Sequence, residues 1–225
     1  MQRPGLLRRA LAEAIAAFAL VFAGCGAVVT DAVRDGALGP IGVAAAFGLV
    51  VMVMVYAVGH LSGAHVNPAV TLAFALTRHF PPREAAAYVA AQLAGAAAGA
   101  QLLLALWGGA PAALGATVPT IGAGGALVYE IALTALLMFV IVAVATDTRA
   151  VGAGAAIAIG ATVALDALLG GPLTGASMNP ARSLGPALAA GEWTHFWVYV
   201  AGPLAGAALG ALAYQLVRTP GRARP

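Results

Sequence analysis

The sequence predicts an all-α membrane protein in which six transmembrane helices and two re-entrant half-helices form an inverted repeat. Three observations lead to this fold class. The 225 residues are 62% hydrophobic and 8% charged, so the chain cannot cover a soluble globule with polar surface. Six apolar stretches are long enough to span a bilayer. The tripeptide Asn-Pro-Ala occurs twice, as Asn67, Pro68 and Ala69 and again as Asn179, Pro180 and Ala181.

The six apolar stretches cover residues 9–30, 40–60, 84–107, 123–146, 151–171 and 195–217. They are rich in alanine and glycine, whose small side chains let helices approach closely in lipid. A cleaved signal peptide at the N-terminus is disfavoured, because the first stretch exceeds the roughly 7–15 residues of a typical hydrophobic signal core.

Arginine placement predicts the orientation of the chain. With six spans, one side of the membrane carries Arg3, Arg8, Arg9, Arg78, Arg83, Arg149, Arg218, Arg222 and Arg224. The other side carries Arg34 and Arg182. The positive-inside rule then places both termini in the cytoplasm, with the protein in the plasma (inner) membrane. The net charge of +3 is a topology signal of this kind, so we expect no nucleic-acid partner.

Each Asn-Pro-Ala copy predicts the start of a short helix at membrane depth. Asparagine is a favoured N-cap residue, and proline is favoured at the first helical position. The apolar residues that follow continue for only about three turns, or roughly 16 Å, which is half of a hydrocarbon core about 30 Å thick. Two half-helices in matching positions of two halves indicate a site at the bilayer midplane.

The two halves, at about 8–107 and 123–217, align on these tripeptides as one channel domain. Glu13 at the start of the first span then matches Glu130 at the start of the fourth. Three spans per half is an odd number, so the second half enters the membrane from the opposite side. Carboxylates inside spans are costly unless hydrogen-bonded. We therefore expect Glu13 and Glu130 to accept hydrogen bonds from the broken backbone segment of their own halves.

The sequence gives no indication of an enzyme, a metal site or a cofactor. The two glutamates could serve as a catalytic acid pair, but no nucleophile, metal cluster or phosphate-binding loop accompanies them. Cys25 is the one cysteine, which excludes an internal disulfide, and it is interpreted as small packing filler in the first span.

The paired tripeptides, with both glutamates in register, resemble the aquaporin superfamily, the major intrinsic proteins. Three runs, at residues 48–60, 147–152 and 175–186, are most similar to the nodulin-like intrinsic proteins of plants and their bacterial relatives. The resemblance implies a channel for water and small neutral solutes, with one pore in each subunit of a homotetramer. It also implies that the lipid bilayer surrounds the protein and that no cofactor is bound.

The resemblance further assigns four selectivity-filter positions to Phe47, Ala167, Ala176 and Arg182. Water-selective members typically carry histidine at the position of Ala167, so alanine predicts a wider, partly apolar opening. Such an opening favours glycerol, urea and undissociated boric or arsenous acid. Ser183 is of the water-channel type, in contrast to the acidic residue of glycerol facilitators, and the subtype signals therefore conflict.

The residues also predict how ions are excluded. Two helix N-termini at the midplane carry about half a positive charge each. A cation about 5 Å from their combined charge is repelled by about 3 kcal/mol at an effective dielectric constant of 20. If each asparagine oxygen caps its own half-helix, the amide NH₂ group is free to donate into the lumen. His65 resembles a histidine at the cytoplasmic mouth, where it serves as a gate or as a structural hydrogen-bonding group. Asp166, beside Ala167, is expected to face a neighbouring helix or a subunit interface, or to be protonated.

Three alternatives to a channel for water and small solutes remain at this stage. A water-restricted channel is compatible with Ser183. A secondary transporter also uses inverted repeats, although the spans offer only Glu13, Glu130 and Asp166 as acidic ligands for a coupling ion. A non-conducting adhesion protein of the same superfamily is the third alternative.

Overall fold

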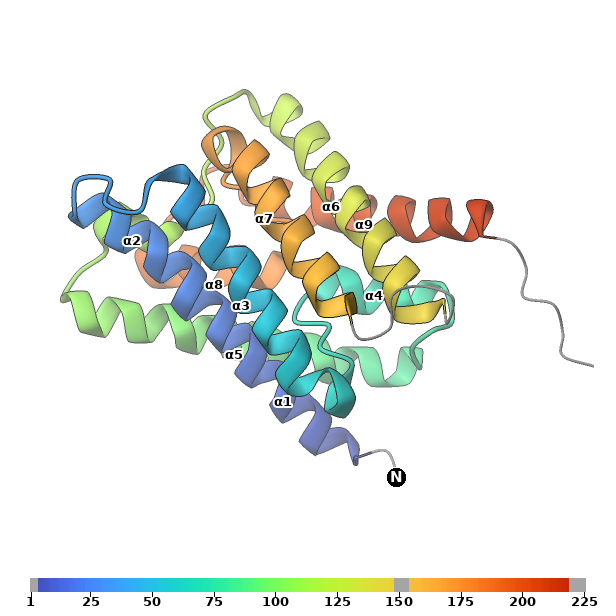
Figure 1. Cartoon of the computed structure of the whole chain (residues 1–225). Coiled ribbons are helices and arrows are strands. Elements are labelled where there is room, and N and C mark those ends of the chain that lie inside the picture. Colours follow the sequence, from blue (N-terminus) through green and yellow to red (C-terminus); the bar gives the residue numbers. More distant parts are fainter. Residues whose placement is uncertain (1–3, 148–153, 219–225) are drawn as a thin grey trace, which may run out of the picture.

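The structure, a computed structural model, describes residues 4–147 and 154–218. The helices are α1 (Leu6–Leu20), α2 (Gly26–Val33), α3 (Gly39–Ser62), α4 (Pro68–Leu76), α5 (Pro82–Trp107), α6 (Ala123–Thr146), α7 (Ala155–Thr174), α8 (Pro180–Ala190) and α9 (Val198–Val217). They form one bundle in which the two short helices α4 and α8 lie among the long ones (Figure 1). The predicted fold class is confirmed.

Within the described residues, six helical segments are long and apolar enough to cross a membrane. The first is continuous from Leu6 to Val33, because α1 and α2 are joined by a π-helical turn at Val21–Cys25. The sequence predicted an uninterrupted span at 9–30, and the π turn is a difference from that expectation. The other predicted spans agree with α3, α5, α6, α7 and α9 to within a few residues.

The long helices pack in corresponding pairs in the two halves. In the first half α1 packs against α5, in the second half α6 packs against α9, and α3 packs against α7 between the halves. Gly48 and Gly160 lie against each other where α3 and α7 pack. A Cβ on Gly48 would lie 2.5 Å from the Gly160 carbonyl oxygen, and a Cβ on Gly160 would lie 2.6 Å from the Gly48 carbonyl oxygen. Glycine at both positions therefore allows backbone contact between the halves.

Five of the arginines that the topology argument assigns to the side of the termini lie among the described residues, and one of them, Arg9, is buried. Arg8, Arg78, Arg83 and Arg218 are exposed near helix ends. Partial burial and the positive charge of Arg218 lower the pKa of His79, so the end of α9 lies near the turn that follows α4. Arg3, Arg149, Arg222, Arg224 and the first residues of the predicted span 151–171 lie outside the described residues.

Candidate transport pathway

Both Asn-Pro-Ala copies begin half-helices with the predicted cap geometry. The side-chain oxygen of Asn67 accepts a hydrogen bond from the Ala69 amide at 2.8 Å. The side-chain oxygen of Asn179 accepts from the amides of Ala181 at 3.0 Å and Arg182 at 3.3 Å. Proline follows each asparagine at the first helical position, where its missing N–H costs no hydrogen bond.

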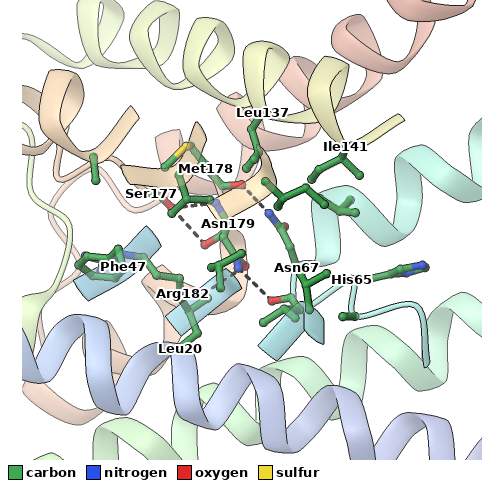
Figure 2. A pocket seen from close by; sticks show the side chains of 18 of the residues that line it. Leu20, Phe47, His65, Asn67, Leu137, Ile141, Ser177, Met178, Asn179 and Arg182 are labelled. Carbon is green, nitrogen blue, oxygen red and sulfur yellow. Dashed lines mark hydrogen bonds between the residues drawn. The ribbon is translucent and has the colours of Figure 1, made fainter. Parts of the chain in front are cut away.

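The two helix starts are tied to each other across the middle of the protein. The Asn67 Nδ2 group donates to the Met178 carbonyl at 2.7 Å, and the Asn179 Nδ2 group donates to the Val66 carbonyl at 3.0 Å. The expectation that each amide NH₂ is entirely free for the lumen is therefore wrong. One hydrogen of each amide holds the opposite segment, and the second is left for the cavity that both asparagines line (Figure 2).

The segments that precede the half-helices are held in a strained backbone conformation. Ala64 and Val66 have φ values of 47° and 56°, and Ala176 and Met178 have values of 43° and 52°. Such left-handed conformations of residues other than glycine cost about 1–3 kcal/mol each and persist only where the surroundings enforce them. The hydrogen bonds of Glu13 and Glu130 provide that enforcement.

Glu13 anchors the first segment. Its Oε1 accepts from the Ser62 hydroxyl at 2.7 Å and the His65 amide at 2.9 Å, and its Oε2 accepts from the Val66 amide. Gln92 on α5 adds a fourth hydrogen bond, from Nε2 to Oε2 at 2.8 Å, and also donates to the Thr71 hydroxyl. Sequence reasoning missed this role, although Gln92 is a polar residue within an otherwise apolar run.

Glu130 makes the equivalent set of hydrogen bonds in the second half. Its Oε1 accepts from the Thr174 hydroxyl at 2.7 Å and the Ser177 amide at 2.9 Å, and its Oε2 accepts from the Met178 amide at 2.8 Å. The α9 residue aligned with Gln92 is Pro203, which has no side-chain donor. Glu130 is fully buried and holds its segment through three donors.

Two cavities meet at one ring of side chains. The inner cavity is lined by both asparagines and by apolar residues of α3, α6 and α7, and the outer cavity is lined by residues that include Asp31 and Val118. The residues that line both cavities are Phe47, Ala167, Ala176 and Arg182. These are the four positions expected at the selectivity filter. Phe47 and Arg182 lie at one end of the inner cavity, with the asparagines beyond them (Figure 2).

Arg182 is buried and held on two sides. Its Nη1 donates to the Gly115 carbonyl at 2.7 Å, and its guanidinium carbon lies 4.7 Å from the centre of the Phe47 ring. A guanidinium over an aromatic face is attracted by the ring quadrupole. Arg182 is therefore not a surface arginine, since its exposed fraction is 4%. The Gly115 carbonyl was not predicted.

His65 lies at the other end of the inner cavity (Figure 2). Its Nδ1 is 3.1 Å from the Thr71 hydroxyl oxygen. The rings of Phe74, Phe80 and Tyr88 surround it, with centroids 4.8–5.2 Å from that of the imidazole. This packing fits the structural role that the sequence allowed for His65.

Three further predicted residues lie away from both cavities. Asp166 is fully buried, which fits the alternative that it faces a neighbouring helix and not the alternative of a subunit interface. Among the described residues its carboxyl oxygens have no hydrogen-bond partner. Ser183 is also fully buried, with its hydroxyl 2.8 Å from that of Thr117 and 2.6 Å from that of Ser177. Cys25 is buried in the π-helical turn.

Comparison with known proteins places this geometry in a family. The family described as Major intrinsic protein matches residues 1–214 of the chain. The chain belongs to the major intrinsic protein family. The members of this family are channels and not enzymes.

Similar major intrinsic proteins include plant aquaporins of the nodulin-like type. Aquaporin NIP1-1 of Zea mays is 53% identical over 94% of this chain and 75% of its own length. Nodulin-26 of Glycine max is 48% identical over 94% of this chain and 78% of its own length. The X-ray structure of the aquaglyceroporin from Plasmodium falciparum superposes with a TM-score of 0.83 at 26% identity, covering 95% of this chain and 97% of that one. The predicted nodulin-like resemblance is confirmed.

Proposed function

We propose that this major intrinsic protein is a passive pore for water and small uncharged solutes, among them glycerol, urea and boric or arsenous acid, and that it excludes ions and protons. The observation that carries the proposal is the meeting of the two cavities at Phe47, Ala167, Ala176 and Arg182. The constriction and the paired helix starts then lie on one path through the subunit.

Ion exclusion follows from the charges along this path. The N-termini of α4 and α8 face each other at the asparagines, and each contributes about half a positive charge. Arg182 adds a full positive charge at the constriction. The inner cavity is otherwise lined mainly by apolar side chains, such as Leu137, Ile141 and Val163, which cannot replace the hydration shell of an ion.

Proton exclusion follows from the fixed orientation of the two amides. Asn67 and Asn179 are each held at the oxygen by their own half-helix and at the nitrogen by the opposite segment. The second amide hydrogen of each can donate to the oxygen of a passing water. A water that accepts from both amides turns its own hydrogens away from the midplane, which interrupts the chain of hydrogen bonds that a proton would follow.

The small side chains at the constriction support passage of solutes larger than water. Ala167 and Ala176 contribute only methyl groups to the ring. Ser183, which suggested a water channel in the sequence, is buried in a hydroxyl chain and lines neither cavity. Ser183 therefore does not border the path, and the two alanines favour passage of a small polyol.

Stopped-flow light scattering on proteoliposomes tests this proposal. We expect rapid shrinkage in an impermeant sugar, shrinkage followed by reswelling in glycerol or urea, and no protein-dependent proton uptake in an acid jump. Shrinkage without reswelling in any of these solutes would indicate a water-restricted channel. Protein-dependent proton uptake, or the absence of protein-dependent water flux, would contradict the proposed pore.

Replacing Arg182 with alanine is expected to weaken cation exclusion far more than it changes water flux. The substitution removes a buried unit charge whose repulsion of a cation is worth about 1.7 kcal/mol at about 10 Å and an effective dielectric constant of 20, more than tenfold in rate. Sodium and proton leakage should be measured beside water flux, with the exposed Arg34→Ala as a control. If a folded Arg182→Ala variant excludes cations as well as the wild type does, Arg182 is not part of the filter.

The assembly and orientation are part of the same proposal. The chain forms a single domain with halves at about 8–107 and 123–217. Both termini lie in the cytoplasm. The protein is a homotetramer in the plasma (inner) membrane. Exposed apolar side chains such as Ile41, Leu49, Ile157 and Leu168 support extensive contact with lipid or neighbouring subunits. Chemical cross-linking in the membrane and protease accessibility of a C-terminal tag test these two points.

A further inference from the structure

The π-helical turn in the first span lies behind the constriction. Leu20, just before the turn, lines the inner cavity, and Val28, beyond it, lines the outer cavity. Gly24 lies between them along the helix and is buried, yet it lines neither cavity. Since Phe47 borders both cavities, its ring lies between Gly24 and the lumen. π-helical turns are frequent at functional sites because they change which residues a helix presents.

The Phe47 ring rests directly on Gly24. A Cβ added at Gly24 would lie 2.9 Å from Cζ of Phe47 and closer still to Cε1 and Cδ1. Real Cβ atoms essentially never make such contacts, so any larger residue at this position must displace the ring. Glycine inside a helix costs about 1 kcal/mol relative to alanine, and here it leaves room for the ring.

The ring cannot move without affecting the filter. The guanidinium of Arg182 lies 4.7 Å from the ring centre, and the Gly115 carbonyl holds that guanidinium at 2.7 Å. A ring pushed away from the first span therefore moves into the lumen or against a tethered cation. Either movement narrows the passage between Phe47 and the two filter alanines.

We propose that Gly24 is a positioning residue that sets the width of the constriction, and that it thereby admits uncharged polyols of glycerol size in addition to water. Gly24 acts through Phe47 and touches no permeant molecule. The inference rests on the proposed function, because it requires that the ring of Phe47, Ala167, Ala176 and Arg182 is the filter.

The test is the ratio of glycerol to water permeability in proteoliposomes for Gly24→Ala. One methyl group in a close-fitting site discriminates by about tenfold or more, so we expect the ratio to fall about tenfold while water flux largely persists. Gly26→Ala is the matched control, since its Cβ would lie 3.4 Å from Leu103 Cδ2, an ordinary contact. Gly99→Ala controls for packing damage, because its Cβ would meet the Phe18 carbonyl oxygen at 2.8 Å without touching the ring.

A double-mutant cycle shows whether the effect passes through the ring. Replacing Phe47 with valine makes room for the new methyl group, so the double variant can fold. In this Phe47→Val background, adding Gly24→Ala is expected to leave the ratio of glycerol to water permeability unchanged. The inference is wrong if the permeability ratio falls equally in both backgrounds, or if it is unchanged or raised in the single variant. Either outcome would leave the proposed pore function unaffected. A wild type that excludes glycerol would instead contradict the solute range of the proposed function.

Discussion

Replacing Glu130 with alanine is expected to abolish water permeability and to lower the yield of folded protein severely. The Glu130 carboxylate is the acceptor for the Thr174 hydroxyl and for the backbone amides of Ser177 and Met178. Each buried donor left without a partner costs about 1–3 kcal/mol. The same hydrogen bonds hold Ala176 and Met178 at positive φ, so their loss releases the segment that carries Asn179. Size-exclusion profiles, thermal unfolding in detergent and proteoliposome shrinkage measure the effect.

Two comparisons make this prediction specific. Glu192→Ala removes a partly exposed carboxylate that accepts from the Thr194 amide, and it should leave both stability and flux unchanged. Glu130→Gln keeps one acceptor oxygen and should give an intermediate loss. If Glu130→Ala unfolds at the same temperature as the wild type and conducts water at the same rate, the segment is held by other contacts.

Replacing Ala167 with histidine is expected to reduce glycerol permeability by about tenfold or more while water flux remains measurable. Ala167 borders both cavities together with Phe47 and Arg182. An imidazole at this position fills the part of the lumen that the small alanine side chain leaves open. It can still hydrogen-bond to single-file water. Swelling in glycerol and shrinkage in an impermeant sugar should be recorded on the same vesicles.

Ala145→His serves as the control for Ala167→His. Ala145 lines the inner cavity but not the outer one, so the same side chain there lies away from the constriction. We expect it to leave the ratio of glycerol to water permeability unchanged. If Ala167→His lowers both fluxes in proportion, or if both variants act alike, the filter is not at Ala167.

Much of the fold could be predicted because its signals are local. A span is recognised by the length of its apolar run, and a half-helix start is recognised by asparagine followed by proline. The pairing of Glu13 with the first segment and Glu130 with the second followed from the internal repeat. The four filter positions came from a family resemblance and not from periodicity, and their role in selectivity stays a prediction for the variants above.

The sequence by itself therefore determined the membrane class, the six spans, the two half-helices and the inverted arrangement of the halves. Only the tertiary structure decided how the halves lock together, through Asn67 to Met178 and Asn179 to Val66. It also decided that Gln92 supports Glu13, that Gly115 holds Arg182, and that the Phe47 ring rests on Gly24. Each of these contacts joins residues far apart in the chain. Propensity and periodicity act over a few neighbouring residues, so they carry no information about which distant residues meet.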